Sequence, residues 1–347
     1  MTGVLTDPMR ALARGDYIRA PLLATARPDA YQEWYHFVVH CPGWRLLVNF
    51  SVVGEAHPGR GHRLAPRVIV LAHEERWTGA VARFADTDLH ITGDLSALTV
   101  RGNRMAVGPD GYHLVIDLPE HNINGELHLR PRSQPFAVNN QPLGEGRLNW
   151  LFVPRLDADG WLRIAGRRQR LDAALAYHDH NWGRFRWGDD FAWEWGSVLP
   201  DNPDEPWSFV FMRMTDRRRL RCFSQALHVW RRSEPAAMFR HAAVQVRADG
   251  LLARQPDCTL PPPMRLLLGG SASDVPSSIA ITGTRFADQV RAEFRPESFA
   301  RVALPSQTCL DRSVVLAETS GPARVTGVID GVELDVSGVG VFELLHG

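Results

Sequence analysis

The stretch LTVRGNRMAVGPDGYHLVIDL, residues 98–118, alternates apolar and polar side chains on both sides of a short break. Alternation with a period of two is typical of a half-buried β-strand, because successive side chains of a strand point to opposite faces. The break, GPDG at 108–111, combines the residue types that tight turns favour. The stretch therefore predicts antiparallel strands joined by a hairpin turn.

The same alternation recurs along most of the chain, bounded by Gly, Pro, Asn and Asp. Further examples are WRLLVNFSVVG (44–54), RVIVLAHE (67–74), GELHLRPR (125–132), WSFVFMRMTDRRRLRCFSQALHVW (207–230), AAVQVRADG (242–250) and VIDGVELDVSGVGVFELL (328–345). Helical periodicity is weak, and the candidate helices are DPMRALARGDY (7–17), LPPPMRLLLGG (260–270) and PESFARVAL (296–304). The pattern predicts an all-β protein with few short helices.

Roughly fifteen to eighteen strands of this spacing are too many for one open sheet, since such sheets seldom exceed about ten strands. We therefore expect two antiparallel β-barrels or sandwiches of roughly eight strands each. The predicted domains are an N-terminal extension at 1–29, a first barrel at 30–190 and a second barrel at 191–347. The proline-rich segment 255–264 is expected to be a loop within the second barrel.

The composition excludes several classes of function. The 347 residues contain 39 Lys plus Arg and 39 Asp plus Glu, so no basic field favours nucleic acid. The chain contains no Lys at all, which excludes Schiff-base chemistry and a P-loop nucleotide site. The four cysteines form no C-x-x-C pair, and neither a signal peptide nor a membrane-spanning stretch is evident, so we expect reduced cysteines and a cytoplasmic protein.

The most chemically promising stretch is LAYHDHNWGRFRWGDDFAWEWG, residues 175–196. On a strand, Tyr177, Asp179 and Asn181 share one face, and His178, His180 and Trp182 share the other. A carboxyl group beside a phenol in an apolar cavity can stay protonated near neutrality and donate a proton. The alternative is that Asp179 only accepts hydrogen bonds in a turn at the strand end.

His178 and His180 have the spacing that β-barrel metal sites use for two imidazole ligands. The sequence shows no assignable third ligand. The alternative is that both histidines are hydrogen-bonded in a polar core, and the prediction includes no metal site.

Aromatic residues surround this stretch. In FAWEWGSVL, Trp193 and Trp195 face one way and Glu194 the other, and in YQEWYHFVV the side chains of Glu33 and Tyr35 share a face. Aromatic walls can bury an apolar ligand and attract a developing carbocation. The alternative is that these residues only fill β-barrel cores.

Five motifs, in this order along the chain, resemble those of a known superfamily: EWYHF (33–37), NWLFVPR (149–155), YHDHNWG (177–183), WEW (193–195) and GVGVFELLHG (338–347). The chain resembles the carotenoid 1,2-hydratase (hydroxyneurosporene synthase) group, whose relatives include tocopherol cyclase and the lipocalin-like Diels-Alderases. The resemblance implies two lipocalin-like barrels in tandem and chemistry without a cofactor on a hydrophobic substrate. It also implies that Asp179, in a Y-x-D motif with Tyr177, is the proton donor, and that Trp150 is the aromatic of a W-x-x-x-P-R motif.

Together these observations predict a lyase or isomerase, either a hydratase or a cyclase, that protonates a polyene, isoprenoid or polyketide-like intermediate. The predicted catalytic residues are Asp179 and Tyr177. The predicted substrate-binding residues are Glu33, Tyr35, Trp150, His178, His180, Asn181, Trp182, Trp193, Glu194 and Trp195. The alternatives are a pericyclase that traps one substrate conformer and a carrier that only binds an apolar ligand. The expected partner is a small hydrophobic molecule, without nucleic acid or an integral membrane segment but allowing transient lipid contact.

Overall fold

The computed structural model describes residues 15–24, 30–57, 61–75, 77–143, 146–186, 191–252, 275–305 and 313–346. The chain forms two compact units, and the main change from the first to the second lies between Phe185 and Arg186. Residues 142–145 also group with the second unit. No helix within the described ranges has the length and apolar character needed to cross a bilayer.

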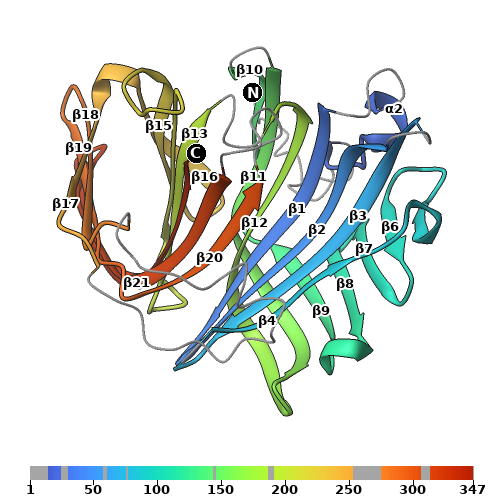
Figure 1. The fold of residues 1–347 in the computed structure, drawn as a ribbon. Coiled ribbons are helices and arrows are strands. Elements are labelled where there is room, and N and C mark those ends of the chain that lie inside the picture. Colours follow the sequence, from blue (N-terminus) through green and yellow to red (C-terminus); the bar gives the residue numbers. More distant parts are fainter. Residues whose placement is uncertain are drawn as a thin grey trace, which may run out of the picture. The chain divides into compact units, whose positions relative to one another are not determined.

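The first unit contains one twelve-stranded sheet in the described part of the chain. The strand order is β4-β3-β2-β1-β12-β11-β9-β8-β7-β6-β5, and β10 also pairs with β11. Figure 1 shows the sheet as a strongly curled layer with long strands at β1, β2 and β3. The strands are β1 (Tyr31–Cys41), β2 (Trp44–His57), β3 (Gly61–His73), β4 (Trp77–Arg83), β5 (Leu89–Ile91), β6 (Ala97–Val100), β7 (Asn103–Gly108), β8 (Gly111–Leu118), β9 (Ile123–Pro131), β10 (Phe136–Leu143), β11 (Gly146–Ile164) and β12 (Arg167–Arg184).

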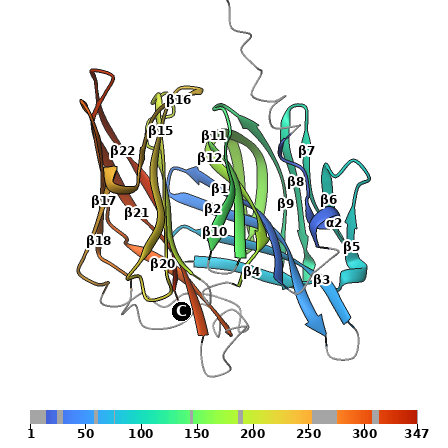
Figure 2. The same cartoon turned by 90° about the horizontal axis from the view of Figure 1, so that it is seen from above.

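The second unit contains a ten-stranded sheet in its described residues, with the order β16-β15-β14-β13-β22-β21-β19-β18-β17 and with β20 paired to β21. This sheet curls until β15 and β16 approach β17 and β18, as Figure 2 shows from above. The strands are β13 (Ala192–Pro200), β14 (Trp207–Thr215), β15 (Cys222–Arg231), β16 (Glu234–Arg240), β17 (Val244–Asp249), β18 (Ser278–Arg285), β19 (Asp288–Phe294), β20 (Ser298–Pro305), β21 (Ser313–Ile329) and β22 (Val332–His346).

Helical structure in the described residues is short. The helix α2 (Ala20–Leu23) has Pro21 in its first turn, where the missing N–H of proline costs no hydrogen bond. The 3-10 turns are η2 (Asp86–Asp88), η3 (Pro119–His121) and η4 (His241–Ala243). The all-β fold with few short helices that the sequence predicts is confirmed.

The alternating stretch at residues 98–118 forms β6, β7 and β8, with the predicted hairpin turn between β7 and β8. The basic run at 216–221 lies in the turn between β14 and β15. The strands and turn at 98–118 confirm the alternation and turn signals on which the fold prediction depends.

One predicted helix is wrong. Residues 298–305 of PESFARVAL form strand β20, which pairs residue by residue with the first half of β21. The long edge of β21 supplies backbone hydrogen bonds that outweigh the weak helical pattern, as tertiary context commonly does. The candidate helix at 260–270 and the loop at 255–264 lie outside the described residues, as do residues 7–14 of the N-terminal candidate.

The described residues contain 22 strands, more than the predicted range. Part of the excess has a simple cause, because a strand as short as β5 presents too few residues for an alternation to be recognised. Cys41 and Cys222 are free thiols, whereas Cys258 and Cys309 lie outside the described residues.

Candidate functional site

The side chains of strand β12 alternate between the two faces of the sheet, as the sequence predicts. It pairs with β1 on one side and β11 on the other, so side chains from three neighbouring strands share each of its faces. His178, His180 and Trp182 lie on the inner face of the curled sheet, beside Tyr35 of β1. Tyr177, Asp179 and Asn181 lie on the opposite face, which we call the Asp179 face.

On the inner face, a buried carboxylate bridges the two histidines. Asp16 lies 3.1 Å from His178 Nε2 and 2.5 Å from His180 Nδ1, and all three side chains are inaccessible to solvent. Tyr112 of β8 donates its hydroxyl hydrogen to Asp16 at 2.5 Å. The second nitrogen of His178, Nδ1, contacts the backbone oxygen of His36 at 2.9 Å.

His180 lies between two carboxylates. Its Nε2 contacts Glu33 Oε1 at 2.8 Å while its Nδ1 contacts Asp16. Burial acts to lower the pKa of His180, but Asp16 and Glu33 overcome it and raise the pKa above its usual value. Conversely, burial acts to raise the pKa of Asp16, but His180 and His178 hold it far below its usual value. The cluster is therefore a buried ion pair network.

This network anchors the N-terminal segment to the first sheet. The backbone N–H groups of Arg19 and Ala20 donate to Glu33 at 2.7 Å each, and Tyr31 donates to the same carboxylate at 2.8 Å. A backbone hydrogen bond from Ile18 to Leu95 attaches the segment to the turn between β5 and β6. All four ring nitrogens of His178 and His180 contact protein groups.

The Asp179 face carries a second buried carboxyl group. Tyr177 donates its hydroxyl hydrogen to Asp179 Oδ2 at 3.0 Å, and Asn181 Nδ2 donates to Oδ1 at 2.5 Å. Asp179 is 4% exposed. Two donors to one carboxyl group stabilise its ionised form.

Aromatic and imidazole side chains flank Asp179 across the strands. Its register partners are His36 on β1 and Phe152 on β11, and the ring of Phe152 stacks on Trp150 at 4.2 Å. Burial, with a contribution from His178, lowers the pKa of His36 to about 3, so its imidazole is neutral at pH 7. The face therefore combines one carboxyl group, one neutral imidazole and several aromatic rings.

In the second unit, Trp193 and Trp195 lie on a face of β13 that also holds a pair of buried acids. Trp193 Nε1 donates to Glu343 Oε1 at 2.8 Å, and Trp195 is the register partner of Glu343. Glu318 of β21 lies directly opposite Glu343 of β22. Both glutamates are buried, with 5% and 8% exposure. We call these residues the Glu343 face.

Two carboxyl groups this close cannot both be ionised away from water. Directly opposite residues of an antiparallel pair have Cβ atoms about 4.5–5.5 Å apart. Burial and the neighbouring Glu318 raise the pKa of Glu343 well above its usual value, against the opposing effect of the Trp193 hydrogen bond. Glu343 therefore holds its proton to a higher pH than an exposed glutamate does.

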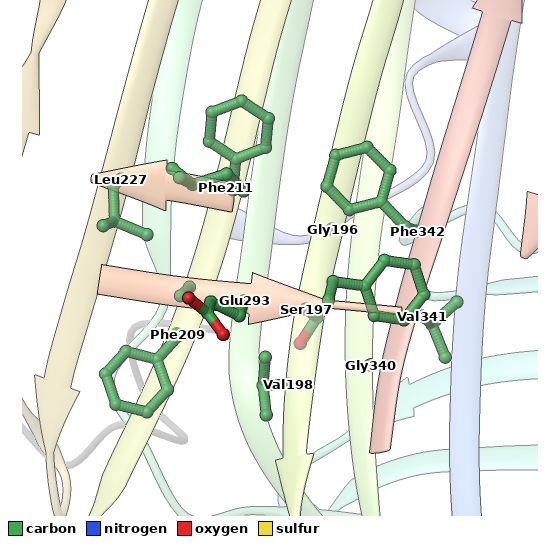
Figure 3. A pocket seen from close by; sticks show the side chains of 13 residues that line it. Gly196, Ser197, Val198, Phe209, Phe211, Leu227, Glu293, Gly340, Val341 and Phe342 are labelled. Atoms are coloured by element: carbon green, nitrogen blue, oxygen red, sulfur yellow. The ribbon is translucent and has the colours of Figure 1, made fainter. Parts of the chain in front are cut away.

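The inner face of the second sheet contains a small apolar pocket of about 30 Å³. Figure 3 shows the rings of Phe209, Phe211 and Phe342 around it. Gly196 and Gly340 make room for the aromatic rings, because a Cβ atom at either glycine would lie 2.4 Å from a phenylalanine ring. The pocket suits an apolar group rather than a charged one.

The residues predicted from sequence thus separate into four places. Asp179, Tyr177, Asn181 and Trp150 share the Asp179 face, whereas Glu33, Tyr35, His178, His180 and Trp182 lie on the inner face of the first sheet. Trp193 and Trp195 share the Glu343 face. Glu194 lies on the inner face of the second sheet and forms an ion pair with Arg213 at 3.3 Å.

Sequence reasoning missed four polar residues: Asp16, Tyr112, Glu318 and Glu343. Asp16 falls in the predicted extension, and Tyr112 is an ordinary apolar member of an alternating strand. Glu343 offered a signal, because a glutamate interrupts the apolar run VFELL at 341–345. Only the pairing of β21 with β22 reveals that Glu318 lies opposite it.

Comparison with known proteins supports the fold. No family model matches the chain, and no curated protein matches it. A protein of Nitrosomonas europaea assigned as AttH is 13% identical with a TM-score of 0.63, covering 95% of this chain and 97% of that one. CghA bound to Sch210972 is 13% identical with a TM-score of 0.61, covering 91% and 88%.

Kievitone hydratase from Nectria haematococca is also similar, at 11% identity with a TM-score of 0.54, covering 94% of this chain and 92% of that one. At these identities the likenesses establish the fold. The chain has the two-unit, lipocalin-like β architecture of these proteins, as its sequence motifs implied.

Replacing Asp16 should destabilise the first unit strongly. Asp16→Ala leaves His180 charged and buried beside a single carboxylate, and breaking a buried ion pair from one side typically costs about 3–5 kcal/mol. Urea denaturation should show this loss. The exposed carboxylate of Asp172 on β12 provides the control, since Asp172→Ala should change stability little. Equal stability of the two variants would contradict an anchoring role for Asp16.

Replacing Glu343 should change how stability depends on pH. The unfolded chain ionises Glu343 near pH 4.5, whereas the folded protein keeps the proton, so the folded state binds more protons and wild-type stability falls as pH rises above 4.5. Glu343→Gln cannot ionise and should remove a slope of up to about 1.4 kcal/mol per pH unit. Urea midpoints of both proteins from pH 5 to pH 8 provide the measurement, and parallel curves would show that Glu343 ionises normally in the folded state.

Proposed function

We propose that the protein is a hydratase or cyclase that acts on a polyene, isoprenoid or polyketide-like substrate by transferring a proton from a buried carboxyl group. The observation that carries this proposal is the Glu343 face, where a buried acid whose pKa is raised by burial and by Glu318 lies beside two tryptophan rings. Kievitone hydratase, which has the same fold, is a hydratase by name.

The chemistry follows from the charge of each group. Protonation of an alkene by Glu343 leaves a carbocation on the substrate and a carboxylate on the protein. Trp193 and Trp195 can stabilise the cation through the negative faces of their rings. Capture by water or by an internal hydroxyl forms a C–O bond and releases the O–H proton. Capture by an internal alkene closes a ring and moves the cation, which then loses a proton from an adjacent carbon. In each case the released proton restores Glu343. No redox cofactor takes part in these steps.

Asp179 and Tyr177 form a second proposed proton-transfer pair. Asp179 was predicted to be the acid from its place beside a phenol, and that role stays a proposal. The two hydrogen bonds that its oxygens accept favour the carboxylate. A carboxylate of this kind is suited to accepting a proton or stabilising a cation, which is why Glu343 is the preferred donor. Trp150 and Asn181 remain the proposed binding residues of this face.

Replacing Glu343 should show whether its carboxyl group, and not the side chains around it, supplies the proton. Glu343→Gln keeps the size and an oxygen acceptor for Trp193, and we expect it to lower kcat by at least about 100-fold, the usual contribution of a general acid. Wild-type activity should persist through neutral pH and decline only as pH rises through the raised pKa of Glu343. The assay uses a substrate found by mass-spectrometric screening of polyene, isoprenoid and polyketide-like compounds.

Three further variants complete that experiment. Glu333→Gln changes an exposed glutamate on the same strand and should leave kcat unchanged. Asp179→Asn should reduce kcat less than Glu343→Gln does. A large loss in Asp179→Asn with an active Glu343→Gln would transfer the acid role to Asp179. Full activity in both, together with a loss in Trp193→Ala, would favour the pericyclase alternative.

The pocket of the second unit favours a second candidate function, that of a carrier for an apolar ligand. Its lining of phenylalanine rings and aliphatic side chains can bury an apolar group without chemistry. A carrier would return its ligand unchanged after incubation.

Cytoplasmic location and contact with lipid stay predictions.

Filling the pocket should block binding of apolar probes. Ala292→Leu on β19 adds three carbon atoms to the lining of the pocket. Because the larger side chain fills space that a bound probe would occupy, we expect the affinity for a fluorescent apolar probe to fall roughly tenfold. Ala280→Leu is the matched control, because the next residue of β18, Ile281, lines the pocket and alternation turns the Ala280 side chain to the opposite face of the strand. Equal probe affinity in the two variants would contradict the pocket as the binding site.

A further inference from the structure

Three potential metal ligands lie together on the outward face of strands β8 and β9, separate from the residues considered above. His113 of β8 is the register partner of His128 of β9, and Glu126 lies two residues before His128 on the same strand. The intervening Leu114 and Leu127 point inward and are fully buried. The alternation of both strands therefore places all three polar side chains on one partly exposed surface.

The ligand atoms of these residues are already close to one another. They all lie within 4.8 Å, with His113 Nε2 at 2.8 Å and His128 Nε2 at 3.5 Å from Glu126 Oε1. The two imidazole rings stack with centroids 4.3 Å apart and planes 8° from parallel. Ligands of a tetrahedral zinc ion with bonds of about 2.0–2.1 Å stand about 3.4 Å apart. Small side-chain rotations in these exposed residues are enough to reach that separation.

The protonation states suit a cation. The hydrogen bond from His113 lowers the pKa of Glu126, so the carboxylate is ionised at neutral pH. A neutral imidazole offers a lone pair to a metal ion. Exposure of about half of the Glu126 and His128 side chains leaves room for water as a further ligand.

Neighbouring charges do not oppose the cation. Arg130 follows two residues after His128, but it forms an ion pair with Asp159 of β11. Asp159 is itself the register partner of His128 and also accepts a hydrogen bond from the backbone of Ala173. Its carboxylate therefore neutralises the arginine and leaves the three candidate ligands as a separate group.

We propose that His113, Glu126 and His128 bind a divalent first-row transition metal ion of the Zn²⁺ or Cu²⁺ class, with water completing the coordination. Two imidazoles and one carboxylate form a ligand set that such ions accept and that Ca²⁺ and Mg²⁺ do not prefer. The bound ion links β8 to β9 through side chains from both strands. This site differs from the pair His178 and His180, whose ring nitrogens are all engaged by protein groups.

Titration calorimetry of the full-length, untagged, chelator-treated protein with zinc chloride tests the proposal. The wild type should bind one zinc ion at this site. His113→Ala, His128→Ala and Glu126→Gln should each weaken binding at least about tenfold, since loss of even an outer-shell partner costs about 10–100-fold.

His121→Ala is the matched control, because His121 lies in the turn between the same two strands but outside the cluster. It should bind zinc as the wild type does. Thermal unfolding of each variant without metal shows that it is folded. Absence of zinc binding in the wild type, or an unchanged affinity in the folded double variant His113→Ala/His128→Ala, would overturn the proposal.

Discussion

The alternation of side chains along β12 is the constraint on which the first unit depends. His178 and His180 face inward, where Asp16 and Glu33 surround them with negative charge. One residue away, Asp179 faces the opposite side. A shift of one residue in the pairing with β1 would exchange the two sets, which would leave the ionic network without partners. The network therefore fixes the register that presents Asp179 on its own face.

The second unit uses the same geometry to keep an acid away from water. Trp193 and Glu343 share one face of their sheet, while Gly196 lies on the other face beside the apolar pocket. Burying two carboxyl groups opposite each other is costly for a fold unless one of them keeps its proton. Such a pair of buried acids lowers the stability of the fold. Destabilising groups with a shifted pKa are typical of catalytic sites.

The sequence predicted local features well because they depend on neighbouring residues. The hairpin at 108–111 and the separation of Tyr177 and Asp179 from His178 follow from turn chemistry and strand alternation alone. The contacts of Asp16 could not be predicted, because they join residues more than 160 positions apart. Pairing of Glu318 with Glu343 likewise depends on the register of two long strands. Strand β20 was missed because pairing with β21, not its own pattern, determines its conformation.

The central claim is that a protein carboxyl group delivers a proton to a carbon atom of the substrate. Turnover in D₂O followed by mass spectrometry of the product tests it most directly. The account predicts one carbon-bound deuterium in the product of the wild-type protein and almost no product from Glu343→Gln. A product without carbon-bound deuterium, formed equally well by both proteins, would contradict it.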